Sequence, residues 1–191
     1  MDTLEAIASR RSVGKVTQER PPREMIERIL DAAVQAPNHR LSEPWRFFVL
    51  AGDARKELGE VMADVLRGGM DEPEGEGAIA QLTKEAEKPL RAPVVIVVAS
   101  KRSDNPKVVP IEDVEATAAA VENMLLAAHA LGLAAMWRTG DAAYHPLVKR
   151  LFDLTPEDHI AGFIYVGYPA VELGPRKRTP ASDLAEWRGW D

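Results

Sequence analysis

Cysteine is absent from all 191 residues of the sequence, and its absence removes several kinds of chemistry together. A chain without cysteine has no disulfide, no thiolate metal site, no iron–sulfur cluster and no cysteine nucleophile. Such a composition fits a reducing compartment. The residues from Met1 to Glu5 are acidic and lack the apolar core of a signal peptide, so we expect a cytoplasmic protein.

Long apolar runs and an excess of basic residues are also missing. The apolar runs fall well short of the roughly 20 residues that span a bilayer, so no membrane partner is expected. The net charge of −6 argues against a nucleic acid partner, because such binding rests on a basic surface. With 46% hydrophobic and 28% charged residues the composition is globular, and the length suits one domain over residues 1–191.

Several common catalytic patterns cannot be found either. The sequence contains no glycine-rich phosphate loop of the dinucleotide-binding or Walker type. No serine lies in a nucleophile-elbow context. The histidines have no zinc-ligand spacing among them; they are His39, His129, His145 and His159. We therefore expect no metal site, and hydrolase chemistry is disfavoured.

What is present is a mixture of helix and strand patterns. Apolar residues at helical spacing predict helices over residues 3–10, 25–34, 54–66, 112–131 and 146–152. Short β-branched or apolar runs predict strands over 47–51, 94–99, 133–137 and 160–166. The stretch 68–77 is rich in glycine and acidic residues and predicts a solvated loop. Because helices and strands do not alternate regularly, the pattern favours an α+β fold.

Two local features carry polar groups that a ligand could use. Arg10, Arg11 and Ser12 stand at the end of the first predicted helix and offer planar donors suited to a phosphate, or else charges that favour a helix C-terminus. The loop 36–45 lies between two prolines and displays Asn38 and His39, as ligand-binding loops do, although a plain helix-to-strand connection would look the same.

A third feature ends the strand at 133–137. The residues Trp137, Arg138, Thr139 and Gly140 follow one another there. An arginine at the end of an apolar strand is either a ligand-binding group or a salt-bridge anchor. Spacing by itself leaves both interpretations open.

The order of these features resembles that of the nitroreductase flavoproteins, in particular their short single-domain branch. The resemblance covers nearly the whole chain, and it rests on an ordered set of motifs of which none is specific by itself. The set comprises Arg10-Arg11-Ser12, Pro37 with Pro44-Trp45, Leu131-Gly132-Leu133, Gly167-Tyr168-Pro169 and the basic tail at 176–178.

The resemblance implies a nitroreductase-like fold, with a central mixed or antiparallel sheet flanked by helices, in an intertwined homodimer with FMN at the interface. Arg10, Arg11 and Ser12 would then hold the phosphate and ribityl side, and the tail would add further cations from Arg176 and Arg178. Gln35 and His39 would come from the partner subunit. The strand end would line the flavin with Trp137, Arg138 and Thr139.

The sequence departs from the family pattern at two places, and the second of them concerns the flavin's pyrimidine edge. Many relatives carry arginine at the position of Gly14, and here Lys15 is the neighbouring cation. Relatives of the longer form often carry asparagine and glutamine at the positions of Leu41 and Glu43. Leucine makes no side-chain hydrogen bond, so Gln35 or His39 would have to replace those contacts.

The activity implied by the resemblance is electron transfer from NADH or NADPH to nitroaromatics, quinones or enones. The flavin carries the chemistry and the protein supplies orientation and electrostatics, so no acid–base residue is assigned. Three alternatives stay open: another flavin reaction on the same fold, such as dehydrogenation or dehalogenation; a flavin carrier without turnover; and a domain with no ligand. Whether the loop 68–77 is a lid is left open as well.

Overall fold

The computed structural model describes residues 1–174 and 176–190. Its centre is a four-stranded sheet in which every pairing of neighbouring strands is antiparallel, in the order β1-β2-β4-β3. The strands are β1 (Trp45–Ala51), β2 (Val94–Ser100), β3 (Ala134–Arg138) and β4 (His159–Gly167). The predicted α+β class is confirmed, with a sheet that is antiparallel rather than mixed.

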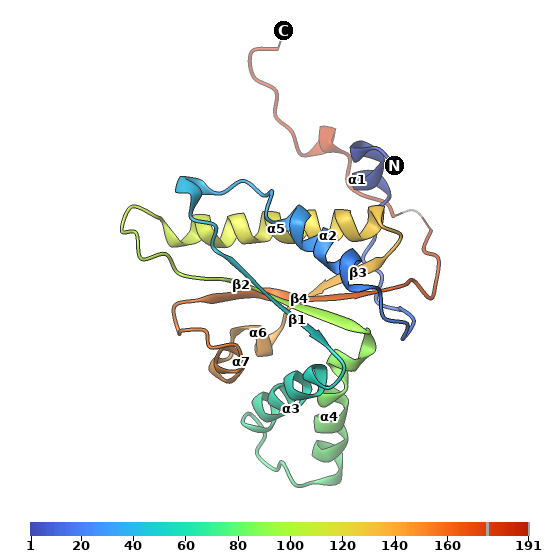
Figure 1. Cartoon of the computed structure of the whole chain (residues 1–191), viewed down its shortest axis with the longest axis vertical. Coiled ribbons are helices and arrows are strands. Elements are labelled where there is room, and N and C mark those ends of the chain that lie inside the picture. The colour runs from blue at the N-terminus through green and yellow to red at the C-terminus, as the bar shows by residue number, and fades with distance from the viewer. Residues whose placement is uncertain (175, 191) are drawn as a thin grey trace.

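Helices cover both faces of this sheet (Figure 1). One face carries α5 (Pro110–Ala130) with α2 (Arg23–Ala33) packed on it, and α1 (Thr3–Ser9) lies beside α5. The other face carries α3 (Ala54–Arg67), α6 (Asp141–Tyr144) and α7 (Pro146–Leu151), with α4 (Glu76–Ala86) packed against α3.

This layering explains the composition of the two central strands. Every residue of β2 is buried, and in β4 only His159 is partly exposed. A strand covered on both faces needs apolar side chains at successive positions, as the run Val94 to Ala99 provides. The central helix α5 is similar, because it packs on the sheet with one side and on α2 and α1 with others.

The helices and strands predicted from periodicity are all present within a few residues of the expected bounds. The helix α4 was not predicted, and the predicted loop ends earlier than expected because Glu76 and Gly77 already belong to α4. Leu82 is the only buried residue of α4, so its apolar stripe is too thin to be recognised. The end of α4 lies close against α3, because a Cβ at Gly59 of α3 would collide with the carbonyl oxygen of Ala86.

The segment after α1 runs along the outer edge of β3 and so brings the N-terminus to the sheet. Ser12 forms a parallel bridge to Ala135, and the amide of Val13 donates to the Ala135 carbonyl at 3.1 Å. Further on, the amide of Ala170 donates to the Lys15 carbonyl at 3.0 Å. The chain beyond Arg176 then passes α1 and leaves the body of the molecule (Figure 1).

None of the helices in the described ranges is both long enough and apolar enough to cross a lipid bilayer.

Candidate functional site

Five of the predicted site residues line a single pocket, although they come from opposite ends of the chain. We call this the basic pocket; its volume is about 350 Å³. Its polar lining consists of Arg10, Arg11, Ser12, Glu122, Arg176 and Arg178. Four arginines therefore face one acidic residue, an excess of positive charge that suits a phosphate or another oxyanion.

The end of α1 decides how the first two arginines are placed. Arg10 is the C-cap residue, with an extended ψ of 135°, and the last turn of α1 contains no basic residue. Arg10 therefore caps the helix, and Arg11 and Ser12 lie beyond it. A side-chain nitrogen of Arg11 donates to the carbonyl of Gly174, which ties the tail to the pocket.

Arg10 is only partly satisfied within the chain. Its side chain is 15% exposed, and its Nε lies 3.3 Å from Oε1 of Glu122 on α5. The Nη1 atom of the same guanidinium is buried and has no hydrogen-bond partner among residues 1–174 and 176–190. A buried donor without a partner costs on the order of 1–3 kcal/mol, so its presence marks a place where a further acceptor is needed. A phosphate oxygen in the basic pocket would be such an acceptor.

A second pocket lies at the end of β3, and two of the other predicted site residues, Arg138 and Thr139, line it. We call this the strand-end pocket; its volume is about 820 Å³. Arg138, Thr139 and Gly140 line it from the strand end, and Gly68 and Gly69 line it from the end of α3. Its wall is completed by charged and aromatic groups that include Glu85, Lys88, Arg91, His145 and Tyr165.

Trp137 is anchored through its indole rather than free. Its Nε1 donates to the carbonyl of Ala161 at 2.9 Å, and the ring lies against Gly162. Gly162 has φ +150°, and a Cβ there would lie 2.4 Å from the indole nitrogen, so only glycine permits this contact. The side chain remains 37% exposed, which leaves part of the ring accessible to a ligand.

Arg138 lies above an aromatic ring instead of joining an ion pair. Its guanidinium carbon is 5.8 Å from the centre of the Tyr165 ring. Within residues 1–174 and 176–190, no carboxylate pairs with it. The salt-bridge alternative for Arg138 therefore has no partner in this part of the chain. Burial raises the pKa of the Tyr165 hydroxyl, while the nearby charges of Arg138 and Arg91 act in the opposite direction.

The short segment from Arg10 to Gly14 joins the two pockets. A Cβ at Gly14 would lie 2.9 Å from Cε of Met136 and 3.5 Å from Nη2 of Arg138. The missing side chain at position 14 thus leaves room for a guanidinium that arrives from β3. From Arg10 to Gly14 the chain spans at most about 14 Å.

Gln35 and His39 lie outside both of these pockets. The Gln35 side chain is exposed, and its amide contacts the Asp31 carbonyl at 3.5 Å. His39 is also exposed and lines a separate pocket with Asn38 and Glu112. Within one chain, the structure does not bring these two residues to the arginines.

The loop that carries His39 has an unusual backbone. Arg40, Leu41 and Glu43 have positive φ values of 55°, 51° and 43°. Such conformations are uncommon for residues other than glycine, and they concentrate at functional sites. The loop is fastened to α5, because the Ser42 hydroxyl donates to Oδ1 of Asp113 at 2.6 Å. Leu41 nevertheless remains 84% exposed.

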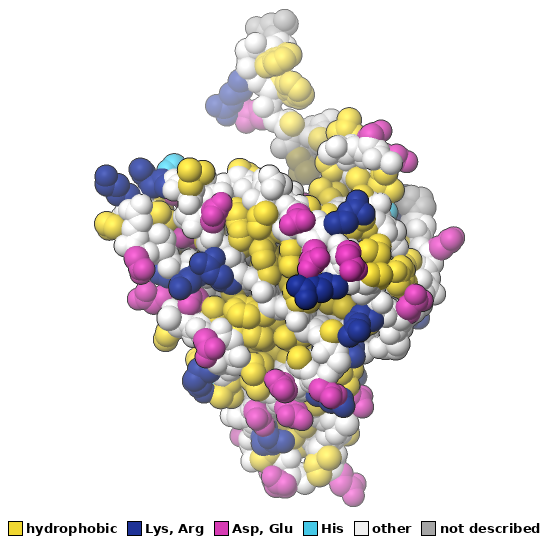
Figure 2. All heavy atoms as spheres, in the orientation of Figure 1, with side chains coloured by type: hydrophobic (Ala, Val, Ile, Leu, Met, Phe, Trp, Pro, Cys, Tyr) yellow, Lys and Arg dark blue, Asp and Glu magenta, His cyan; other side chains and the backbone are white. Residues whose placement is uncertain are grey.

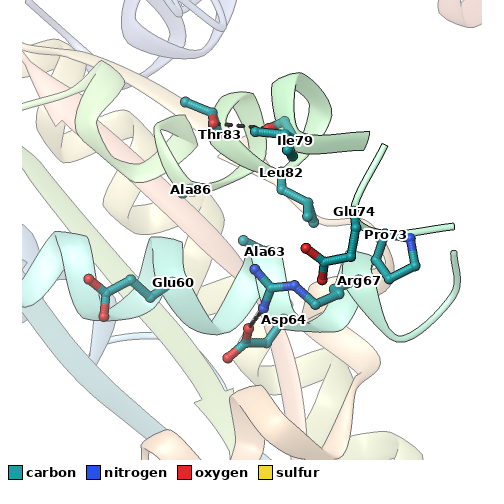
Figure 3. A pocket seen from close by; sticks show the side chains of 10 residues that line it. All are labelled: Glu60, Ala63, Asp64, Arg67, Pro73, Glu74, Ile79, Leu82, Thr83 and Ala86. Carbon is teal, nitrogen blue, oxygen red and sulfur yellow. Dashed lines mark hydrogen bonds and ion pairs between the residues drawn. The ribbon is translucent and has the colours of Figure 1, made fainter. Parts of the chain in front are cut away.

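A further pocket of about 340 Å³ lies between α3 and α4 (Figure 3). Its charged groups are mainly acidic: Glu60, Asp64 and Glu74 face Arg67, which pairs with Asp64. Pro73 and Glu74 come from the loop after α3 and close one end of this pocket. Its charge makes it a poor place for a phosphate.

Several residues that line the two pockets were not predicted from the sequence. No local motif distinguishes these residues, which lie in helices or strands whose patterns indicated only a structural role; they are Glu122, Lys88, Arg91 and Tyr165. The one available signal was the phenol of Tyr165 in a strand that is otherwise apolar. The roles of all ten predicted site residues stay predictions, since geometry shows their neighbours but no ligand.

Comparison with known proteins identifies the family that the order of sequence motifs indicated. The model of the nitroreductase family matches residues 7–168. The chain is 32% identical to YdjA of Escherichia coli K12, a candidate NAD(P)H nitroreductase, over 94% of this chain and 95% of YdjA. The crystal structure of a nitroreductase-like family protein from Bacillus cereus superimposes with a TM-score of 0.84 at 29% identity, covering 99% of this chain and 97% of that one.

A second solved structure bears on the ligand. It is that of a candidate nitroreductase from Desulfovibrio desulfuricans in complex with FMN, with a TM-score of 0.74 and 29% identity, covering 100% of this chain and 99% of that one.

Proposed function

The chain belongs to the nitroreductase family, and from that premise we propose that it is an FMN-dependent oxidoreductase. It transfers electrons from NADH or NADPH to a small organic acceptor such as a nitroaromatic, a quinone or an enone. The observation that carries the proposal is the basic pocket, where residues more than 160 positions apart in sequence place four arginines around one small volume.

The basic pocket would hold the FMN phosphate. Arg10, Arg11 and Ser12 provide donors from the segment after α1, and Arg176 and Arg178 add charge from the tail. The buried Nη1 of Arg10 would gain an acceptor that the described part of the chain does not provide. The pair between Arg10 and Glu122 keeps the guanidinium in place before the phosphate arrives.

The strand-end pocket would receive the flavin ring. Arg138, Thr139 and Gly140 line this pocket, and Trp137, which precedes them in β3 and is not among the lining residues, is positioned by its bond to Ala161. FMN, when bound, supplies the hydride and electron transfer that protein side chains cannot perform. The protein orients the ring and places the Arg138 cation beside it, where a positive charge favours the reduced, more negative form.

The site would be completed by a second copy of the chain. Gln35 and His39 are exposed and lie in neither pocket of their own chain, and Leu41 next to them is an exposed apolar side chain. These observations support a homodimer in which each FMN is held by two chains. We include a cytoplasmic location and a single domain over 1–191 in the proposal, since reduced nicotinamides are supplied inside the cell.

One absorbance spectrum of the purified protein tests the core of the proposal. We expect a yellow protein with flavin bands that bleach when NADH or NADPH is added without oxygen. A yellow protein that does not bleach would indicate a carrier, and a colourless one without FMN affinity would contradict the proposal. Anaerobic assays with nitroaromatics, quinones and enones then separate nitroreduction from dehydrogenation or dehalogenation on the same fold.

The assembly needs its own measurement. Obligate interfaces of this kind bury on the order of 2,000 Å² or more, so the dimer should persist at micromolar concentration. Light scattering on the FMN-loaded protein checks this. A monomer that keeps its FMN would rule out the shared site.

A further inference from the structure

The strand-end pocket extends past the end of β3 to two groups that the proposed flavin site leaves unused. Arg91 ends the short 3-10 helix Lys88–Arg91, and Tyr165 lies in the central strand β4; both line the pocket. The Tyr165 side chain is 94% buried, since its exposed fraction is 6%. Because Tyr165 is buried and yet lines the cavity, its hydroxyl can bind a ligand inside that cavity.

The acidic residues of the pocket are mostly neutralised by close partners. Glu85 pairs with Lys88, and Asp64 pairs with Arg67. Asp141 is the remaining acid and is exposed at the start of α6. Across the two described ranges, neither Arg91 nor Arg138 forms an ion pair. The pocket therefore keeps two guanidiniums without a carboxylate of their own.

These two cations gather around the buried phenol. The guanidinium of Arg138 lies over the Tyr165 ring at 5.8 Å, within the range of a cation–π contact. Arg91 and Arg138 are both close enough to Tyr165 to lower the pKa of its hydroxyl, but burial, which raises that pKa, is the larger influence. The hydroxyl therefore stays protonated near neutral pH and remains a donor.

The rest of the wall is apolar. Met62 and Leu66 face the pocket from α3, Leu147 faces it from α7, and Phe163 from β4. An oxyanion bound by the donors would therefore carry an apolar body along these side chains. The volume of about 820 Å³ lies within the range of pockets for small organic ligands.

We propose that the strand-end pocket binds the carboxylate of an aromatic acid through Arg91, Arg138 and the Tyr165 hydroxyl, with the aromatic ring against its apolar wall. The inference rests on the proposed function in one respect: it makes aromatic acids the preferred electron acceptors. Planar guanidiniums bind carboxylates with two parallel hydrogen bonds, which fixes the orientation of the acid as well as its affinity.

Titration with benzoate tests the site without turnover, and it is carried out on both the FMN-free and the FMN-loaded protein. We expect binding to both forms. The variant Arg91→Gln should weaken it about ten- to a hundredfold, and Tyr165→Phe about two- to tenfold, because one donor is charged and the other neutral. Arg150→Gln is the matched control, since it removes an exposed cation from α7 outside the pocket and should leave benzoate binding unchanged.

Kinetics with matched acceptors test the role of the site in the reaction. The ratio of kcat/KM for 4-nitrobenzoate to that for nitrobenzene should exceed one in the unmodified protein. It should fall in Arg91→Gln about as far as benzoate binding falls, and it should stay constant in Arg150→Gln. Benzoate binding that ignores both Arg91→Gln and Tyr165→Phe, or that disappears when FMN is added, would overturn the inference. A protein that binds benzoate as expected but no FMN would instead contradict the proposed function.

Discussion

Arg10 and Asp158 are both charged side chains with little exposure, yet only one of them is satisfied within the chain. Asp158 is 3% exposed and accepts hydrogen bonds from the amides of Arg102 and Thr155, both at 2.7 Å, and from the Thr155 hydroxyl at 2.9 Å. Within the residues that the structure describes, Arg10 has one ion pair and a buried Nη1 without a partner. The carboxylate of Asp158 therefore has its hydrogen-bond partners within the chain, whereas the basic pocket keeps a donor that a ligand could use.

Buried polar atoms without a partner are also found near the start of α5. Oδ1 of Asp113 accepts from Ser42, but Oδ2 of Asp113 and Oε2 of Glu112 are buried and have no partner in the two described ranges. These atoms lie beneath the strained loop that carries His39. Because buried polar groups are almost always hydrogen-bonded in complete structures, unpaired ones mark surfaces that await a ligand or a second chain.

The largest effect is expected at the basic pocket. Arg10→Ala should lower FMN affinity about ten- to a hundredfold, because hydrogen bonds to a charged group contribute roughly 1.5–3 kcal/mol each. The thermal stability of the FMN-free protein should change little, since the lost guanidinium was only partly satisfied. Equilibrium dialysis and calorimetry measure the two quantities, with Arg150→Ala as control. Undiminished FMN affinity would mean that the basic pocket does not hold the phosphate.

The opposite result is expected at Asp158. Asp158→Asn should lower the free energy of unfolding by about 1–3 kcal/mol at pH 7 and leave the FMN affinity of the folded protein unchanged. The exposed neighbour Glu157→Gln provides the control for charge. Chemical denaturation checks the prediction, and loss of FMN without loss of stability would break the contrast between the two regions.

The pH dependence of that effect has a defined sign. Burial by itself would raise the pKa of Asp158, but the hydrogen bonds from Arg102 and Thr155 outweigh it and leave the pKa below its ordinary value of 3.8. A lowered pKa in the folded state stabilises the protein above the ordinary value, and this contribution is lost as the pH falls through the lowered one. The difference between Asp158→Asn and the unmodified protein should therefore shrink below about pH 4.

A moderate effect is expected at Arg138. Arg138→Leu should lower the midpoint potential of bound FMN by on the order of 30 mV, which corresponds to about 1.4 kcal/mol for two electrons. FMN affinity should fall less than in Arg10→Ala, because the phosphate contacts remain. Spectroelectrochemistry measures the potential. An unshifted potential with a lower melting temperature would show that Arg138 acts only through its packing on Tyr165.

The smallest effect, at His39, can be amplified by mixing subunits. His39→Ala by itself should weaken FMN binding about two- to tenfold, as expected for a neutral hydrogen bond. In a mixed dimer of Arg10→Ala and His39→Ala chains, one site has lost both groups and the other has kept both. Half of the sites should therefore bind FMN with unmodified affinity. If a single chain supplied both groups to each site, no intact site would form.

Much of this architecture follows from local sequence patterns. The spacing of Ile26, Ile29 and Ala33 specifies α2, and the apolar run from Val94 to Ala99 specifies a strand covered on both faces. A periodic pattern of apolar residues indicates which face of a helix or strand is buried, and it can be recognised from residues that are close together in the sequence. The short helix α4 was missed for the same reason, since it buries only Leu82 and is held by its contact at Gly59.

The sites depend on contacts that no local pattern contains. Arg10, Arg11 and Ser12 stood out in the sequence, but only the folded chain places Arg178 beside them and pairs Arg10 with Glu122. The resemblance to a family indicated these residues, whereas Arg91 and Tyr165 had no signal in the sequence that tied them to one another. The fold brings both residues to the wall of one pocket although they lie 74 positions apart, with the 3-10 helix of Arg91 packed against α3 and α4. Local periodicity does not predict such distant pairs. It indicates which face of a helix or strand is buried, but not which other residues pack against that face.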